Sequence, residues 1–248
     1  HAIVVEKTKS THLHTWTIAA AMVLGVSGLT LFRGAASGVF AGQGDNLDYV
    51  WQLLLASMSF AVALIYPVLL AVLASRVVDI EHRGQGWIMS ATSSVTPGTL
   101  LRAKLIYHGR MITGATLAIS AIIAATGLVS GASSTFPAGL WAIYTVVTIV
   151  VSLAVFATHL VVSSTIDNQL VCLAIGVGGL FLAVFGQALP GWLNHITPWG
   201  YFTLIRPADY VGEELVYFDL PIISVAVMAI IATAGFHAIT AHFDRKEL

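Results

Sequence analysis

A serine and a histidine are the first residues in this chain whose types could carry out chemistry. Gly25-Val26-Ser27-Gly28 spells G-x-S-G, and His237 lies much later in the sequence. A serine hydroxyl becomes a nucleophile when a histidine base lies within hydrogen-bond reach and nearby donors stabilise the oxyanion. Such a pair could hydrolyse a peptide bond. A four-residue match in a stretch rich in glycine and serine is nevertheless a weak signal.

Metal ligands are the second kind of chemistry to weigh. The chain has nine histidines, but His12 and His14 are two residues apart, and such residues do not share a face of a helix. The acids and the histidine within 79–82 are explained by ion pairs or by docking to a partner. The single cysteine, Cys172, lies inside an apolar run, which excludes a disulfide framework and a cysteine-based cluster. We therefore expect no metal site.

The elements that would position these residues are membrane-spanning helices. Of the 248 residues, 57% are hydrophobic and 9% are charged, whereas soluble domains carry about 25% charged residues. A helix that crosses the hydrocarbon core needs about 20 mostly apolar residues. The sequence therefore predicts an all-α polytopic membrane protein, one domain over 1–248, with six spans at approximately 15–32, 49–75, 111–129, 140–162, 169–189 and 220–241.

The placement of lysine and arginine predicts the orientation, because cytoplasmic segments carry an excess of both. With the amino terminus inside, the inside segments hold nine of these residues and the outside segments hold two, Arg33 and Arg206. Both termini are therefore expected on the cytoplasmic side. The net charge of −1 gives no reason to expect nucleic acid as a partner.

Two connections between spans are unlike simple loops. The external segment 190–219 is rich in aromatic residues, so we expect it to dip back into the outer leaflet as short, broken helices. Four aromatic side chains are then expected at headgroup depth, namely Trp192, Trp199, Tyr201 and Phe202. The cytoplasmic stretch 76–110 holds most of the inside charge. Its apolar patch around Trp87, bracketed by charges, predicts a short amphipathic helix that either docks a soluble partner or anchors at the membrane surface.

This stretch is similar to one found in permeases of ATP-driven transporters of the ABC-2 type. The similarity rests on Glu81, on Trp87 after a gap, on Thr96-Pro97, and on Lys104 ahead of the next span. The start of the chain, Glu6-Lys7-Thr8-Lys9, and the six-span layout are similar too. Within that superfamily the chain most resembles the subgroup that protects bacteria from lantibiotics and other antimicrobial peptides.

The resemblance implies a function and its partners. The segment between the second and third spans would be a coupling helix that contacts a separate nucleotide-binding subunit, through Asp79, Glu81, His82, Arg83, Trp87 and Met89. That partner would bind ATP and Mg²⁺, because this sequence contains no G-x-x-x-x-G-K-[ST] motif. This chain would hold no cofactor and would not itself be an enzyme. A second permease subunit, a copy or a paralogue, would complete the transporter in the bacterial plasma membrane.

A path for an exported amphipathic or hydrophobic molecule would be lined by apolar and aromatic side chains and one histidine. The candidates are Trp51, Met58, Phe60, His159, Phe181 and Phe185. For any one of them, packing in the core or against lipid is the competing interpretation. Small glycines allow helices to pack closely, either within the subunit or between subunits. The candidates are Gly25 and Gly28 in the first span and Gly176, Gly179 and Gly186 in the fifth.

Two other functions remain open from the residues. A six-span intramembrane serine protease of the rhomboid type would carry its serine motif on the fourth span, whereas Ser27 lies on the first, and no His-x-x-x-Asn occurs on the second. An ion-coupled secondary transporter usually places charges at mid-membrane. The centres of the predicted spans contain no Asp, Glu, Lys or Arg, which favours an energy source outside the membrane.

Overall fold

The computed structural model describes residues 6, 9, 13–38, 48–83, 95–130 and 135–246. Six long helices dominate this part of the chain: α2 (Thr15–Ala36), α3 (Tyr49–Arg83), α5 (Pro97–Val129), α6 (Ala138–Thr165), α7 (Gln169–Phe185) and α10 (Ile222–Lys246). All six, with α7 counted through the turn that follows it, are long and apolar enough to cross a membrane. The predicted helical class and number of spans are therefore confirmed.

The stretch 76–110 is not the long loop that the charges indicated. Helix α3 continues to Arg83, and α5 begins at Pro97, where the Thr96 hydroxyl accepts a hydrogen bond from the Thr99 amide. Pro97 at the first helical position loses no hydrogen bond there. Charged residues extend both helices because they pair with each other instead of facing hydrocarbon. The expected coupling helix, with Trp87 and Met89, lies within 84–94, outside the described residues.

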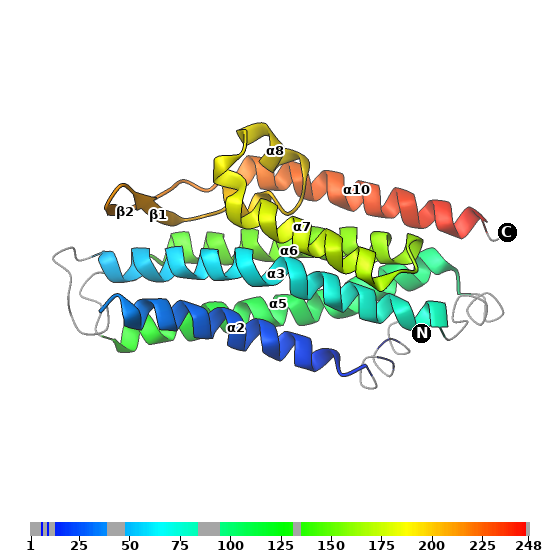
Figure 1. Cartoon of the computed structure of the whole chain (residues 1–248), viewed down its shortest axis with the longest axis horizontal. Helices are drawn as coiled ribbons and strands as arrows, with labels where there is room; N and C mark the ends of the chain where they lie inside the picture. The colour runs from blue at the N-terminus through cyan, green and yellow to red at the C-terminus, as the bar shows by residue number, and fades with distance from the viewer. Residues whose placement is uncertain are drawn as a thin grey trace.

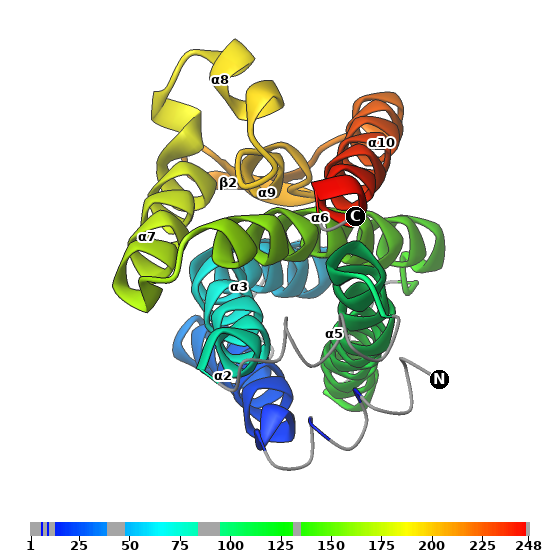
Figure 2. The same ribbon diagram turned by 90° about the vertical axis from the view of Figure 1, so that its right-hand side faces the viewer.

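The helices run side by side, with α3 in the middle of the bundle (Figures 1 and 2). Helix α3 packs against α2, α6 and α7, while α10 packs against α5 and α6. A hydrogen bond of 2.8 Å between the hydroxyls of Tyr66 and Thr116 joins α3 to α5 inside this core. The ring of Trp51 contacts Phe136 and Trp141. The start of α2 and the end of α10, the described helix ends nearest the two termini, lie at the same end of the bundle, on the right in Figure 1.

The segment after α7 folds back onto the bundle. It forms a short 3₁₀ turn, η2 (Gly186–Ala188), and two short helices, α8 (Gly191–Ile196) and α9 (Tyr201–Leu204). A hairpin follows, with β1 (Ala208–Val211) antiparallel to β2 (Glu214–Tyr217). The short helices match the expected broken pattern, but the hairpin is a feature that the sequence reading missed. It lies at the end of the bundle opposite the termini (Figure 1).

The aromatic residues of this segment differ in how far other parts of the protein cover them. Tyr201 and Phe202 are buried, whereas Trp192 is largely exposed. Trp199 lies partly buried against α7, and its indole N–H donates to Nε2 of His159 on α6 at 3.3 Å. Headgroup depth for the four aromatics stays a prediction, and two of the four rings are enclosed by protein.

Glycines on α7 and η2 let neighbouring parts of the chain approach closely. A Cβ added to Gly176 would meet Ala71 of α3, one added to Gly179 would collide with the Trp199 ring, and one added to Gly186 would collide with Thr203. All three glycines therefore serve packing within the subunit, one of the two alternatives that the sequence left open. On α2, Gly25 faces Ile65 of α3, while Gly28 has open space around it.

Candidate functional site

Four charged side chains from three separate segments meet at the end of the bundle that carries both termini. Lys104 of α5 donates to the Glu81 carboxylate of α3 at 2.8 Å and to both oxygens of Glu6 at 3.0 and 3.1 Å. Lys9 donates to the same oxygen of Glu81 at 2.7 Å. We call these four residues, Glu6, Lys9, Glu81 and Lys104, the ion cluster.

The ion cluster is enclosed by protein. The side chain of Lys104 is 0% exposed, those of Glu6 and Glu81 are 1% exposed, and that of Lys9 is 26% exposed. A buried charge is costly unless it is paired and hydrogen-bonded. Two cations and two anions give a formally neutral group in which every charge has a partner. Its formation therefore requires that the amino-terminal segment, α3 and α5 come together.

The two glutamates hold different positions in the ion cluster. Glu81 accepts a short hydrogen bond from each lysine, whereas Glu6 accepts two from Lys104 and lies 3.9 Å from Lys9. Burial raises the pKa of the Glu6 carboxyl, and the attraction of Lys104 offsets only part of that effect. Glu81 is thus the carboxylate that bridges both lysines. For Glu6, burial disfavours the charged form more than the lysines favour it.

Further polar contacts tie the other helices together at the same end. Arg102 of α5 donates to Asp244 of α10 at 2.7 Å, and the Gly98 amide donates to the same carboxylate at 2.8 Å. His82 lies 2.9 Å from Asp167, in the turn between α6 and α7. Charged groups therefore connect α5 to α10 and α3 to the α6–α7 turn, and two of them, Arg102 and His82, lie within two residues of Lys104 and Glu81 in the sequence.

The predicted coupling residues occupy different environments. Arg83 is 75% exposed, so a soluble partner can reach it, and it pairs at 2.8 Å with Asp79 one turn earlier, whose side chain is 20% exposed. His82 is less exposed and is engaged with Asp167 and with the Ser163 carbonyl. Glu81 faces into the ion cluster. Its expected direct contact with a partner does not agree with a carboxylate this enclosed, and its contacts instead connect α3 to the amino-terminal segment.

The sequence reading did not pair Glu6 and Lys9 with Glu81 and Lys104. All four residues had been noted, because each belongs to one of the two segments that carry the resemblance. Their distances in the chain, 98 residues between Glu6 and Lys104 and 72 between Lys9 and Glu81, hide the contact. No local signal marks the contact, since Glu6 already has an opposite charge, Lys9, three residues away in the sequence.

The expected path residues do not form one surface. Trp51, Met58 and His159 are completely buried between helices, whereas Phe60, Phe181 and Phe185 are exposed on the outside of the described chain. The exposed rings do not all gather either, since Phe60 contacts Arg33 while Phe181 and Phe185 stack on each other. Core packing, the competing interpretation, agrees better with the first three.

The hydrolytic pair is not assembled. Ser27 lies on α2, which packs against α3 and α5, and His237 lies on α10, on the opposite side of the bundle (Figure 2). The buried Ser27 hydroxyl has no hydrogen-bond partner among the described residues. In the same part of the chain, no group of three or more His, Cys, Asp or Glu side chains could hold a metal ion.

Comparison with known proteins agrees with the transporter interpretation. The family model described as "ABC-2 family transporter protein" matches residues 3–186. The match includes the whole ion cluster and runs from the amino-terminal segment to the end of α7. No curated protein matches the chain.

Proposed function

The chain belongs to the ABC-2 family of transporter proteins as a membrane permease subunit that works with a separate ATPase, and from this premise we propose how it is driven and what it moves. ATP binding and hydrolysis by the partner move the segment 84–94, and the ion cluster passes that movement to α3, α5 and the amino-terminal segment together. The substrate is an amphipathic or hydrophobic molecule that is exported across the bacterial plasma membrane, with antimicrobial peptides as the first class to test.

The ion cluster is the observation that supports this mechanism. The segment 84–94 directly joins the end of α3 to the start of α5. Glu81 lies two residues from the end of α3, and Lys104 lies two turns into α5. Their ion pair of 2.8 Å, with a side-chain exposure of 1% or less, fixes these two helices to each other. A displacement of the connecting segment therefore moves both helices as one unit instead of separating them.

The Asp79–Arg83 ion pair at the end of α3, in which Arg83 is the exposed member, suits contact with the ATPase. Asp79 and Arg83 present both signs of charge beside the segment 84–94. Charges at the rim of an interface steer association and fix its register. We assign Asp79 and Arg83 to docking, together with His82, Trp87 and Met89, and Glu81 to transmission inside the permease. ATP and Mg²⁺ bind to the partner, and a second permease subunit, a copy or a paralogue, completes the transporter.

The assignment is tested by separating binding from transport. The chain is produced with its ATPase and placed in proteoliposomes, where association is measured by pull-down and export by ATP-dependent movement of a fluorescent antimicrobial peptide. We expect Glu81→Gln to keep the ATPase bound but to reduce ATP-dependent transport at least about tenfold, since a buried charge pair is lost. Arg83→Glu should instead weaken association, and Arg76→Gln, an exposed change on the same helix, should leave both unchanged.

Two results would contradict the proposal. If Glu81→Gln releases the ATPase while Arg83→Glu does not, then the residue roles are reversed. If the purified chain moves the peptide without any ATPase, then the permease mechanism fails as a whole. Loss of transport for one peptide alone, with ATPase stimulation retained, would reject that substrate class and leave the coupling mechanism standing.

A further inference from the structure

An open groove lies between α5, α6 and α10, and nothing in the transport mechanism uses it. Its volume is about 680 Å³, within the range of about 300–1,000 Å³ for pockets that hold small ligands. Small residues on all three helices create the space, among them Gly114 of α5, Ala154 of α6 and Ala232 of α10. A Cβ added to Gly114 would meet no atom within 4 Å.

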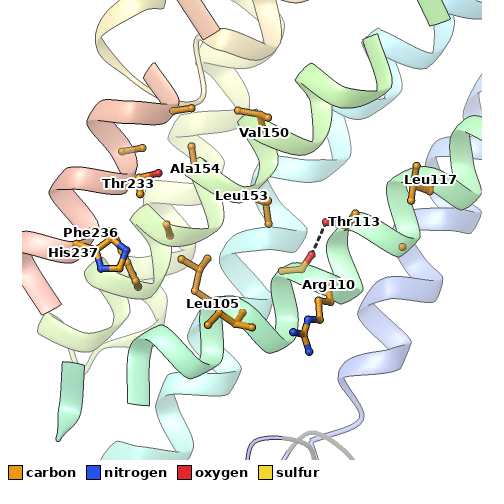
Figure 3. A pocket seen from close by; sticks show the side chains of 16 residues that line it. Leu105, Arg110, Thr113, Leu117, Val150, Leu153, Ala154, Thr233, Phe236 and His237 are labelled. Carbon is orange, nitrogen blue, oxygen red and sulfur yellow. Dashed lines mark hydrogen bonds between the residues drawn. The ribbon is translucent and has the colours of Figure 1, made fainter. Parts of the chain in front are cut away.

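The groove is long and mostly apolar. On α5 it extends from Leu105 to Leu117, a distance of about 18 Å at a rise of about 1.5 Å per residue. One leaflet of hydrocarbon is about half of a core roughly 30 Å thick, so the groove is about as long as one leaflet is deep. Valine, leucine, alanine and phenylalanine side chains form most of its walls (Figure 3). This shape suits an acyl chain.

A cationic side chain lies on the wall of this apolar groove. Arg110 is exposed, and no hydrogen bond or ion pair joins its guanidinium to any residue that the structure describes. Figure 3 shows it on one side of the groove, with His237 on the other. An arginine within a spanning helix is costly unless it reaches the interface or meets an anion. Arg110 thus requires an anionic partner that the described chain does not supply.

A second copy of the chain would not supply that anion either. The acids in the described spans, Asp79, Glu81 and Asp244, all lie in the last turns at the end that carries the termini. Arg110 lies six residues beyond Lys104, the partner of Glu81, and so about 9 Å deeper along α5. A phospholipid, by contrast, places its phosphate just above its acyl chain, within reach of an arginine that extends toward the interface.

We propose that this groove binds one anionic phospholipid from the leaflet at the end of the bundle that carries both termini. One acyl chain lies between α5, α6 and α10, the Arg110 guanidinium pairs with the phosphate, and His237 contacts the headgroup from the opposite side. The site is distinct from the ion cluster and from the exposed residues that face the ATPase.

Lipid retention measured by native mass spectrometry tests the proposal. The purified full chain is exchanged into detergent with equal amounts of phosphatidylglycerol and phosphatidylcholine, and the lipids that stay bound are counted. We expect one tightly retained phosphatidylglycerol. Arg110→Gln should lower its preference over phosphatidylcholine about fivefold, the effect of one basic residue at an anionic surface. Gly114→Leu, which fills the groove and keeps the charge, should remove the retained lipid altogether.

Controls decide between the possible occupants. Arg76→Gln removes an exposed arginine on α3 outside the groove and should leave lipid retention unchanged. Equal retention of both lipids by the unchanged chain, or an unchanged preference in Arg110→Gln, overturns the proposal. So does efficient disulfide cross-linking between two copies through Leu117→Cys in a Cys172→Ala chain, because a second subunit would then fill the groove.

Discussion

At the scale of single residues, the ion cluster turns an unfavourable burial into a specific contact. Its four charges would each be costly alone in a protein interior, and their value comes from being paired. Glu81 supports two lysines, Lys104 and Lys9, at 2.8 and 2.7 Å. The loss of this carboxylate leaves two cations short of a partner, while the loss of Glu6 still leaves Lys104 paired with Glu81.

A matched pair of substitutions follows from this difference. We expect Glu81→Gln to destabilise the detergent-solubilised protein by about 3–5 kcal/mol, the cost of removing one partner from a buried ion pair. Glu6→Gln should cost no more than about 1 kcal/mol, because burial already disfavours the charged form of Glu6 and Lys104 keeps its pair with Glu81. Thermal unfolding of both variants measures which of the two loses more stability. Equal losses would mean that the two carboxylates share the lysines equally, contrary to the distances.

The pH dependence of stability offers a separate check on Glu6. Burial raises the pKa of this carboxyl, so its protonated form is favoured more in the folded chain than in the unfolded one. Its contribution to stability is then fully present below the ordinary pKa of glutamate and is lost as pH rises through the raised pKa. Unfolding curves recorded over that interval should show this loss in the unchanged protein and not in Glu6→Gln. Parallel curves for the two proteins would contradict it.

Sequence reasoning identified the ion-cluster residues but not their arrangement. Glu81 and Lys104 appeared to flank an exposed loop, because charge normally marks the end of a span. The structure instead continues both helices through these charges, since each charge meets an opposite one. No local pattern reveals that Glu6 and Lys9 are the remaining partners. The contact joins positions 72 and 98 residues apart, and only the packing of α3 against α5 brings them together.

At the scale of elements, glycines decide how closely the folded-back segment packs against α7. Gly179 faces the Trp199 ring, whereas its neighbour Gly178 faces open space. Gly179→Ala should therefore force Trp199 away and cost about 1–3 kcal/mol, as overpacking does. Gly178→Ala should be neutral or stabilise by up to about 1 kcal/mol, because alanine favours helix. Thermal unfolding together with tryptophan fluorescence tests both, and a similar loss in the two variants would refute the close contact.

The junction between α10 and α5 allows a second prediction for an element. Asp244 accepts hydrogen bonds from Arg102 and from the Gly98 amide at the start of α5. Since these side chains are partly exposed, we expect Asp244→Ala to cost no more than about 1 kcal/mol. Its local effect should be clearer: faster hydrogen exchange in residues 240–246 and at the start of α5. Unchanged exchange there would show that helix packing alone holds this end.

The number of spans was predictable, while their ends and the connections were not. Apolar length alone identifies six helices, and the part of the chain that the structure describes has six. The folded-back helices α8 and α9 were foreseen from the aromatic residues of 190–219, because such a segment needs an apolar environment. The hairpin that follows was missed. Its strands have four residues each and include Asp209 and Glu214, so they show little of the apolar alternation that marks a strand.

At the scale of the whole molecule, every functional proposal depends on which end of the bundle faces the ATPase. The start of α2, the end of α3 with its exposed Arg83, and the end of α10 lie at one end, and the β1–β2 hairpin lies at the other (Figure 1). From the excess of lysine and arginine we predict that the first end faces the cytoplasm, where ATP is available. If the chain were inverted, the hairpin would face the ATPase, and Asp79 and Arg83 would lie on the side of the membrane where no ATPase can bind them.

Cysteine labelling determines this orientation directly. In a Cys172→Ala chain, Glu213→Cys at the exposed hairpin turn and Arg83→Cys at the end of α3 each provide one accessible thiol. A maleimide that cannot cross membranes should label the hairpin variant in intact cells. It should label the α3 variant only in inverted vesicles or after permeabilisation. The opposite pattern would place the ion cluster outside the cell, and no cytoplasmic ATPase could then drive the permease through it.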